Sequence, residues 1–227
     1  VTGPTGCGKT TTLAALVDLI NSSKTGHIIT IENPVEFIHD NKKCLVSQRQ
    51  VGAHVATFAA ALKSALREDP NVILVGELRD SESIGLALTA AETGILVMGS
   101  LNTNSASRAV NRIVNSFPQK QQNQIRTMLS GSLRAVVAQQ LIRKKDGSGR
   151  VPAVELLFSG PAVGNVIRKG KSHEIDSAIE TGKEAGMQSM DDAIIALIRQ
   201  DVVDREDALG KAFDKAKVSE QSGAEPS

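Results

Sequence analysis

Eight residues near the start of the chain have the types and spacing of a phosphate-binding loop. Residues 3–10 read Gly-Pro-Thr-Gly-Cys-Gly-Lys-Thr and fit the pattern G-x-x-x-x-G-K-[ST]. In such a loop the glycines let backbone N–H groups surround a phosphate, the lysine reaches the β- and γ-phosphates, and the last hydroxyl ligates Mg²⁺. The helical periodicity that begins at Lys9 adds the positive end of a helix to the same place. The predicted nucleotide contacts are Gly3, Pro4, Thr5, Gly6, Cys7, Gly8, Lys9, Thr10 and Thr11, with Thr10 also a ligand of Mg²⁺.

An acidic residue follows a run of four apolar residues further along the chain. Residues 72–75 are Val-Ile-Leu-Val, which is typical of a parallel strand buried on both faces, and Glu77 comes two residues later. Ligands of open α/β sheets bind at the carboxyl ends of the strands. A phosphate loop needs an acidic group there to hold Mg²⁺ or its water. We therefore predict that Glu77 is a catalytic residue and a magnesium ligand, with a solvated loop carboxylate as the alternative, and that Asp80 caps the next helix.

A second acidic cluster follows the β-branched run at residues 27–31. It reads Glu-Asn-Pro-Val-Glu over residues 32–36. Hydrolysis of a γ-phosphate requires a positioned water, and a carboxylate can orient it. Glu32 and Glu36 are both candidates for this catalytic role, and Pro34 fixes the turn that directs them. We favour Glu36, and the alternative is that both are ordinary loop acids.

These side chains need a scaffold, and the first two thirds of the chain alternate helix and strand signals. Helices are expected at residues 9–20, 57–67, 81–92 and 105–115, and another begins at Pro118. Strands are expected at residues 27–31, 44–48, 72–75 and 95–101. Such alternation predicts an α/β fold with a mostly parallel sheet covered by helices on both faces.

The pattern changes after residue 140. Residues 141–144 and 151–158 flank a turn and predict a β-hairpin. Helical segments follow at residues 162–169, 173–181, 191–199 and 205–216. We predict a core over residues 1–158, a small helical subdomain over residues 159–216, and a disordered polar tail over residues 217–227.

Composition excludes several classes of protein. The 227 residues carry a net charge of +1 and include five Phe but no Trp or Tyr, so neither a strong field nor a base-stacking surface favours nucleic acid. The apolar stretches are too short to span a bilayer. Because Cys7 and Cys44 are not expected to pair, the cytoplasm is the expected compartment. Two cysteines exclude a disulfide scaffold and a four-cysteine zinc site, so no zinc is expected. Cys7 fills a variable position of the loop, and a reactive thiol is its alternative role.

Taken together, the motifs resemble the secretion ATPase superfamily of type II secretion and type IV pilus motors. Within it they look like the pilus retraction ATPases of the PilT type. The resemblance extends to about residue 215 and rests on several ordered segments. These are residues 3–15, 30–37, 65–70, 75–80, 88–94, 100–106 and 178–188.

The resemblance implies a RecA-like P-loop ATPase core that uses ATP and Mg²⁺ and works as a homohexameric ring. It also implies a place at the cytoplasmic side of the inner membrane, beside a platform protein of the pilus, as part of twitching motility. An N-terminal PAS-like domain is expected from the family and is missing from this sequence, whose first strand is cut short before Gly3. In the family, nucleotides lie between that domain and the core.

Two positions depart from the family pattern. Its acidic box, Glu-Asp-Pro, here contains Asn33, and its Leu-His-Thr box contains Asn102 followed by Thr103. An asparagine forms hydrogen bonds but carries neither a proton nor a charge. Reduced activity is therefore a consequence to test, and Asn102 and Thr103 are accessory site candidates together with Arg79. For Arg79, contact with phosphate or a neighbouring subunit and an intramolecular salt bridge are both open.

Three functions compete. The leading hypothesis is an ATP-hydrolysing motor of pilus retraction. The second is a nucleotide-binding, weakly hydrolysing paralogue subunit that co-assembles with an active pilus ATPase. A DNA-translocating motor is disfavoured by the charge and the few aromatic residues. A basic stretch near residues 143–150 is either a solvated face or a contact for the platform protein.

Overall fold

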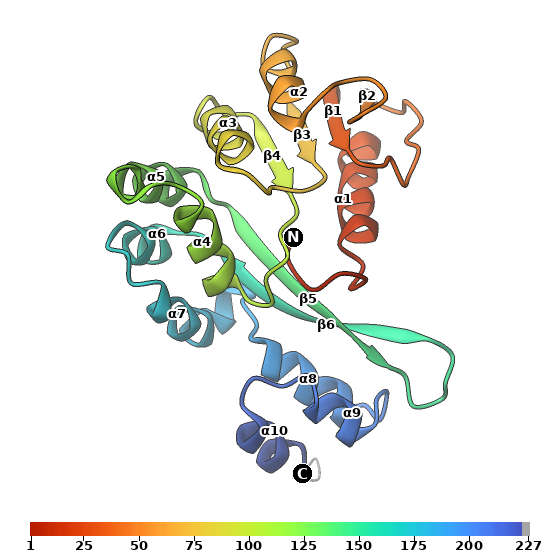
Figure 1. The fold of residues 1–227 in the computed structure, drawn as a ribbon. Helices are drawn as coiled ribbons and strands as arrows, with labels where there is room; N and C mark the ends of the chain where they lie inside the picture. The colour runs from red at the N-terminus through yellow and green to blue at the C-terminus, as the bar shows by residue number, and fades with distance from the viewer. Residues whose placement is uncertain (224–227) are drawn as a thin grey trace.

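The parallel sheet expected from the alternating pattern is present in the computed structural model, which describes residues 1–223 (Figure 1). Its strands are β1 Gly26–Glu32, β2 Cys44–Gln50, β3 Val72–Val75 and β4 Leu96–Gly99. All pairs are parallel, in the order β2-β1-β3-β4. The two central strands, β1 and β3, therefore end side by side at one edge of the sheet.

Helices cover both faces of this sheet, because neighbouring residues of a strand point to opposite sides. Ile28 packs in a cluster with α1 (Lys9–Ser23). Ile29, the next residue, packs with α2 (Phe58–Ala65) and α3 (Ser81–Glu92) on the other side. Both isoleucines are fully buried, so the sheet forms the centre of a three-layer arrangement.

The first residues of the chain join the sheet to a long hairpin. Thr2 forms one parallel bridge with Leu101, just after β4, and another with Ala138. Ala138 belongs to β5 (Ala135–Arg143), which pairs antiparallel with β6 (Arg150–Phe158). The strand expected before the phosphate loop is thus present through Thr2, between the parallel sheet and the hairpin.

One group of helices packs around the base of the hairpin. It consists of α4 (Ala106–Asn115), α5 (Gln119–Ser132), α6 (Pro161–Arg168) and α7 (Ile175–Thr181), which share one hydrophobic cluster. Because α6 and α7 share that cluster with α4 and α5, the helices on either side of residue 158 are packed together. The division of the chain at residue 158 stays a prediction.

A second group of helices covers the outer part of the hairpin. It consists of α8 (Met190–Arg199), α9 (Arg205–Leu209) and α10 (Lys215–Ser222), which pack with Ile142 and Ala153 of the hairpin. Two 3-10 turns, η1 (Ser172–Glu174) and η2 (Lys183–Ala185), flank α7. Within residues 1–223, every helix is too short or too polar to cross a bilayer.

Most predicted boundaries differ from the structure by a few residues at most, but the bounds of β5 and of the last predicted helix were wrong. β5 begins at Ala135 and not at residue 141, because Val136, Val137 and Ala138 continue the apolar strand toward its N-terminus. In place of one helix over residues 205–216, α9 ends at Leu209 and α10 begins at Lys215.

The tail predicted to be disordered from residue 217 is helical up to Ser222. Asp214 caps α10 by accepting a hydrogen bond from the backbone of Lys217 at 2.9 Å. Val218 is fully buried in the cluster under the hairpin. A cap and one buried side chain thus order a segment whose polar composition predicts disorder. The rest of the predicted tail, residues 224–227, lies outside the described residues.

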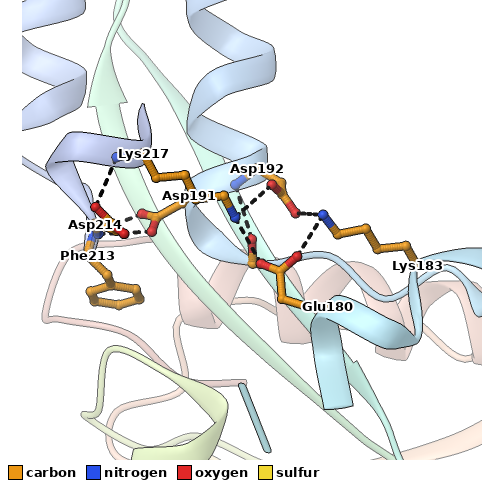
Figure 2. Close-up of polar contacts among 8 residues, drawn as sticks. Glu180, Lys183, Asp191, Asp192, Phe213, Asp214 and Lys217 are labelled. Carbon is orange, nitrogen blue, oxygen red and sulfur yellow. Dashed lines mark hydrogen bonds and ion pairs between the residues drawn. The ribbon is translucent and has the colours of Figure 1, made fainter. Parts of the chain in front are cut away.

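A network of charged side chains connects α10 to the helices before it (Figure 2). Lys217 of α10 and Lys183 of η2 each pair with Glu180 and with Asp192, at 2.7–3.3 Å. Beside them, the nearly buried Asp191 accepts hydrogen bonds from the backbone N–H groups of residues 213 and 214. The network closes a ring of four charges that connects four elements: α7, η2, α8 and α10.

Candidate nucleotide-binding site

The phosphate-loop segment turns tightly between the first strand and α1. Gly6 and Gly8 have φ angles of +78° and +89°, which side chains other than glycine rarely adopt. Gly8 is the N-cap residue of α1. At Gly3, a Cβ atom would lie 2.3 Å from the carbonyl oxygen of Gln139, so the loop packs directly on β5. The glycines of the motif are therefore required by the backbone itself.

The lysine and the threonine that end the motif are the first two residues of α1. The Lys9 ammonium donates hydrogen bonds to the carbonyl oxygens of Gly3 and Pro4, at 2.9 and 3.1 Å. The Thr10 hydroxyl donates to Oε1 of Glu36 at 3.2 Å. The favoured acidic residue, Glu36, thus contacts the residue that follows the loop lysine.

A cavity of about 560 Å³ opens in front of the loop. It collects side chains from the carboxyl ends of β1, β3 and β4, the edge at which α/β sheets bind ligands. From the loop it is lined by Thr5, Gly6, Gly8, Lys9, Thr10 and Thr11. From the strand ends it is lined by Glu32, Asn33, Pro34, Glu36, Gly76, Glu77, Arg79, Ser100 and Asn102.

Four of the predicted site residues lie outside the lining of this cavity. Gly3 and Cys7 are buried beneath the loop, and Pro4 is exposed beside it. Thr103 instead supports the strand, since its backbone N–H donates to the Thr2 hydroxyl at 3.0 Å. These four residues shape the loop from behind or from the side.

Glu77 is held by two partners at the end of β3. Its Oε1 accepts a hydrogen bond from the side-chain amide of Asn102 at 2.8 Å, and its Oε2 pairs with Arg79 at 2.5 Å. The hydrogen bond and the negative charge of Glu77 raise the pKa of Arg79 above its usual value. For Arg79, the intramolecular salt bridge is therefore the arrangement in this structure.

Glu32 and Glu36 differ in their surroundings. Glu32 is 6% exposed, and its Oε1 accepts hydrogen bonds from Thr30 at 2.6 Å and from Gln48 at 3.4 Å. Glu36 is exposed and lies beside Thr10. A carboxylate that orients water must keep free acceptor capacity, so this geometry favours Glu36 for that role and Glu32 for structure.

The donor set suits a small divalent cation. Thr10, Glu36 and Glu77 present hydroxyl and carboxylate oxygens to one cavity, and Mg²⁺ prefers such hard oxygen ligands together with substrate phosphates. The positive charge of Lys9 and the free N–H groups at the start of α1 add an anion site next to it.

Three residues of the hairpin lie at the site without belonging to any of the sequence motifs. Gln139 of β5 is 3% exposed and bonds to the phosphate loop from below. Leu141 and Arg150 of the hairpin line the cavity, although we expected Arg150 only on a basic surface. The signal for Gln139 was a pair of glutamines in an apolar strand run, which no short motif records.

Comparison with known proteins places the chain in a family. Residues 1–204 match the family described as "Type II/IV secretion system protein". The chain is 52% identical to a "Twitching motility protein" of Neisseria gonorrhoeae over 96% of its own length and 59% of that protein. It is also 52% identical to "Type IV pilus retractation ATPase PilT" of Pseudomonas aeruginosa, over 93% of its length and 61% of that protein.

Among solved structures, the chain superposes on the pilus retraction motor PilT with bound ADP at a TM-score of 0.89 and 45% identity. That match covers 96% of this chain and 62% of the PilT chain, so the chain spans about six tenths of each of these relatives. The phosphate loop and all four strands of the parallel sheet lie within residues 1–204, which match the family. The chain belongs to the type II/IV secretion system protein family.

Proposed function

We propose that this chain is the ATPase core of a type IV pilus retraction motor, which binds and hydrolyses ATP with Mg²⁺. The observation that carries the proposal is the single cavity joining Lys9 and Thr10 of the phosphate loop to Glu36 and Glu77 at two strand ends. Relatives named for twitching motility and pilus retraction support the process, and the ADP in the PilT crystal supports the ligand.

The loop residues would bind the phosphates. The backbone N–H groups of Gly6 and Gly8 surround them, and the Lys9 ammonium exchanges the carbonyls of the loop for phosphate oxygens. Thr10 and Glu77 would hold Mg²⁺, which when bound offsets the negative charge of the phosphates. The residues proposed to bind the phosphates and Mg²⁺ all line the same cavity.

The chain's carboxylates would then position the attacking water. Glu36 orients the water and receives its proton, because it is exposed and lies beside Thr10. Asn102 and Arg79 hold the carboxylate of Glu77 from two sides and thereby set its direction toward the cavity. Glu32, tied to the sheet, keeps the end of β1 in place.

The assembly that we propose follows the relatives. It is a homohexamer at the cytoplasmic face of the inner membrane, peripheral to it, in contact with a platform protein of the pilus. An N-terminal PAS-like domain would complete the protein, with the core over residues 1–158 and the helical subdomain over residues 159–216. Opening and closing of the nucleotide sites would drive the ring stepwise.

The test uses the full-length protein with Glu77→Gln. We expect nucleotide binding to persist and turnover to fall by a factor of about 10² or more, since the change removes the charge but keeps the shape. Glu82→Gln is the matched control, because Glu82 lies on the neighbouring helix in an exposed ion pair with Lys63. Wild-type turnover in Glu77→Gln would overturn the assignment.

A second function is favoured by Asn33 and Asn102. We propose as the alternative a weakly hydrolysing subunit that co-assembles with an active paralogue. Asn102 is an uncharged donor to Glu77 where the family pattern has a histidine, which can carry a positive charge. Under this alternative, the double variant Asn33→Asp and Asn102→His gains turnover several-fold, and unchanged turnover rejects it.

A further inference from the structure

The phosphate loop rests on one buried glutamine of the hairpin. The Gln139 amide Nε2 donates a hydrogen bond to the carbonyl oxygen of Cys7 at 2.6 Å. Its Oε1 accepts a hydrogen bond from the Thr12 hydroxyl at 2.9 Å. The side chain is 3% exposed and lies outside the cavity lining, so it acts on the loop from beneath.

The backbone of the same residue is also fixed to the chain that leads into the loop. The N–H of Gln139 donates to the carbonyl oxygen of Thr2 at 2.9 Å. Gln139 therefore contacts the residue before the loop, a residue within it, and the first turn of α1. The amide nitrogen and the amide oxygen of the side chain thus each have a partner.

The bond to Cys7 has a consequence for the phosphate side of the loop. In a trans peptide unit, the carbonyl and the following N–H point in opposite directions. Holding the Cys7 carbonyl down on Gln139 therefore turns the N–H of Gly8 upward, toward the cavity that Gly8 lines. The first intrahelical bond of α1 runs from Thr12 to Gly8, so the earlier N–H groups stay available to a ligand.

We propose that Gln139 is a positioning residue for nucleotide binding: it fixes the peptide between Cys7 and Gly8 so that the loop presents its N–H groups to the β-phosphate. The inference rests on the proposed function, because it assumes that the loop binds a nucleotide. It adds a buried residue beneath the loop to a site otherwise formed by residues that line the cavity. Substitution of Gln139 releases the loop without touching any ligand contact.

The chain offers a matched control in the next residue. Gln140 is 8% exposed on the opposite face of β5, where its amide donates to the carbonyl oxygen of Lys211 at 3.3 Å. The variants Gln139→Leu and Gln140→Leu therefore remove the same group from the same strand. Both lose buried hydrogen bonds, and we expect both to lower the melting temperature of the full-length protein.

Nucleotide affinity distinguishes the two variants. ADP and AMP are titrated against each full-length variant by fluorescence competition. We expect Gln139→Leu to lose about tenfold in affinity for ADP while AMP affinity stays within about twofold, because only ADP carries a β-phosphate. Gln140→Leu should bind both as the wild type does. Equal ADP affinity in Gln139→Leu and the wild type would refute the inference, and so would an equal loss of ADP and AMP affinity.

If Gln139→Leu does not fold, the near-isosteric variant Gln139→Glu tests the same inference. In Gln139→Glu an ionised carboxylate repels the Cys7 carbonyl, whereas the protonated acid donates a hydrogen bond to it. Its ADP affinity, divided by that of the wild type at the same pH, should rise as pH falls from 8 to about 6. A ratio independent of pH would overturn the positioning role. If the wild type itself fails to bind ADP, the proposed function fails and not this inference alone.

Discussion

At the scale of single residues, the three carboxylates that line the cavity differ in their surroundings. Glu32 is nearly buried and accepts two hydrogen bonds from the sheet. Glu77 is partly exposed and held by Asn102 and Arg79. Glu36 has a single long bond, from Thr10, and faces solvent. The sequence already favoured Glu36 for orienting water, and the fold adds the difference in surroundings between Glu36 and Glu32.

This difference predicts that the same substitution, Glu to Gln, has different effects at Glu36 and at Glu32. Glu36→Gln should lower kcat by about 10²–10⁴, since it removes a general base, with little change in stability. Glu32→Gln should keep most of the turnover and lower the free energy of unfolding by about 1–3 kcal/mol, because it disturbs a buried acceptor. Steady-state ATPase assays and urea unfolding of the full-length proteins measure the two effects. The opposite ranking of kcat would return the catalytic role to Glu32.

The residues that the sequence predicted are those with a motif. The loop pattern indicates Lys9 and Thr10 directly, and an acid after a buried strand indicates Glu77. Gln139 could not be predicted, because its role depends on a loop more than a hundred residues away in sequence lying against β5. Arg79 could be placed near the site, but its pairing with Glu77 required the structure.

At the scale of elements, the bounds that were predicted correctly belong to elements defined by local sequence, and the others depend on contacts with distant parts of the chain. β3 and α3 have the predicted bounds, since an apolar run and an Asp80 cap define them without help from other elements. β5 and α10 do not. β5 begins earlier because it pairs with β6 over its full length, and α10 forms because its buried apolar residue, Val218, meets the hairpin cluster.

The charged ring that docks α10 predicts a dependence of stability on pH. The hydrogen bond from Lys183 and, after it, the bond from Lys217 lower the pKa of Glu180 below its ordinary value of 4.5. A carboxyl with a depressed pKa in the folded state stabilises the fold above its unfolded pKa. That contribution is lost as pH falls through the folded pKa. The ring should therefore stabilise the protein at pH 7 and fade on acidification below about pH 4.5.

Lys217→Met tests this dependence, because it removes the charge and keeps most of the apolar stem. Urea unfolding should show the variant less stable than the wild type at pH 7, with the gap shrinking as pH falls through the acid range. Lys63→Met serves as the control, since its pair with Glu82 is exposed and should matter little at any pH. A gap for Lys217→Met that is constant with pH would exclude the ring as its cause.

At the scale of the whole molecule, β5 lies between the phosphate loop and the C-terminal segment of the chain. On one face Gln139 bonds to the phosphate loop, and on the other Gln140 and Ile142 meet the C-terminal helices. The helical segments and the parallel sheet were predictable from periodicity. Their joining through one strand was not, because it depends on Thr2 pairing with both Leu101 and Ala138.

This arrangement predicts that nucleotide binding stabilises the folded chain as a unit. A ligand that binds only the folded state adds about 2.7 kcal/mol to the unfolding free energy at 100 times its Kd. We expect Mg²⁺ and ADP to raise the melting temperature of the full-length wild type, and removal of Mg²⁺ with a chelator to reduce the rise. Lys9→Ala should abolish most of it, because the loop then lacks its phosphate-binding ammonium. Lys24→Ala, which removes an exposed lysine at the other end of α1, should keep the full rise. Equal stabilisation of Lys9→Ala and Lys24→Ala by the nucleotide would show that ADP binds somewhere other than this loop.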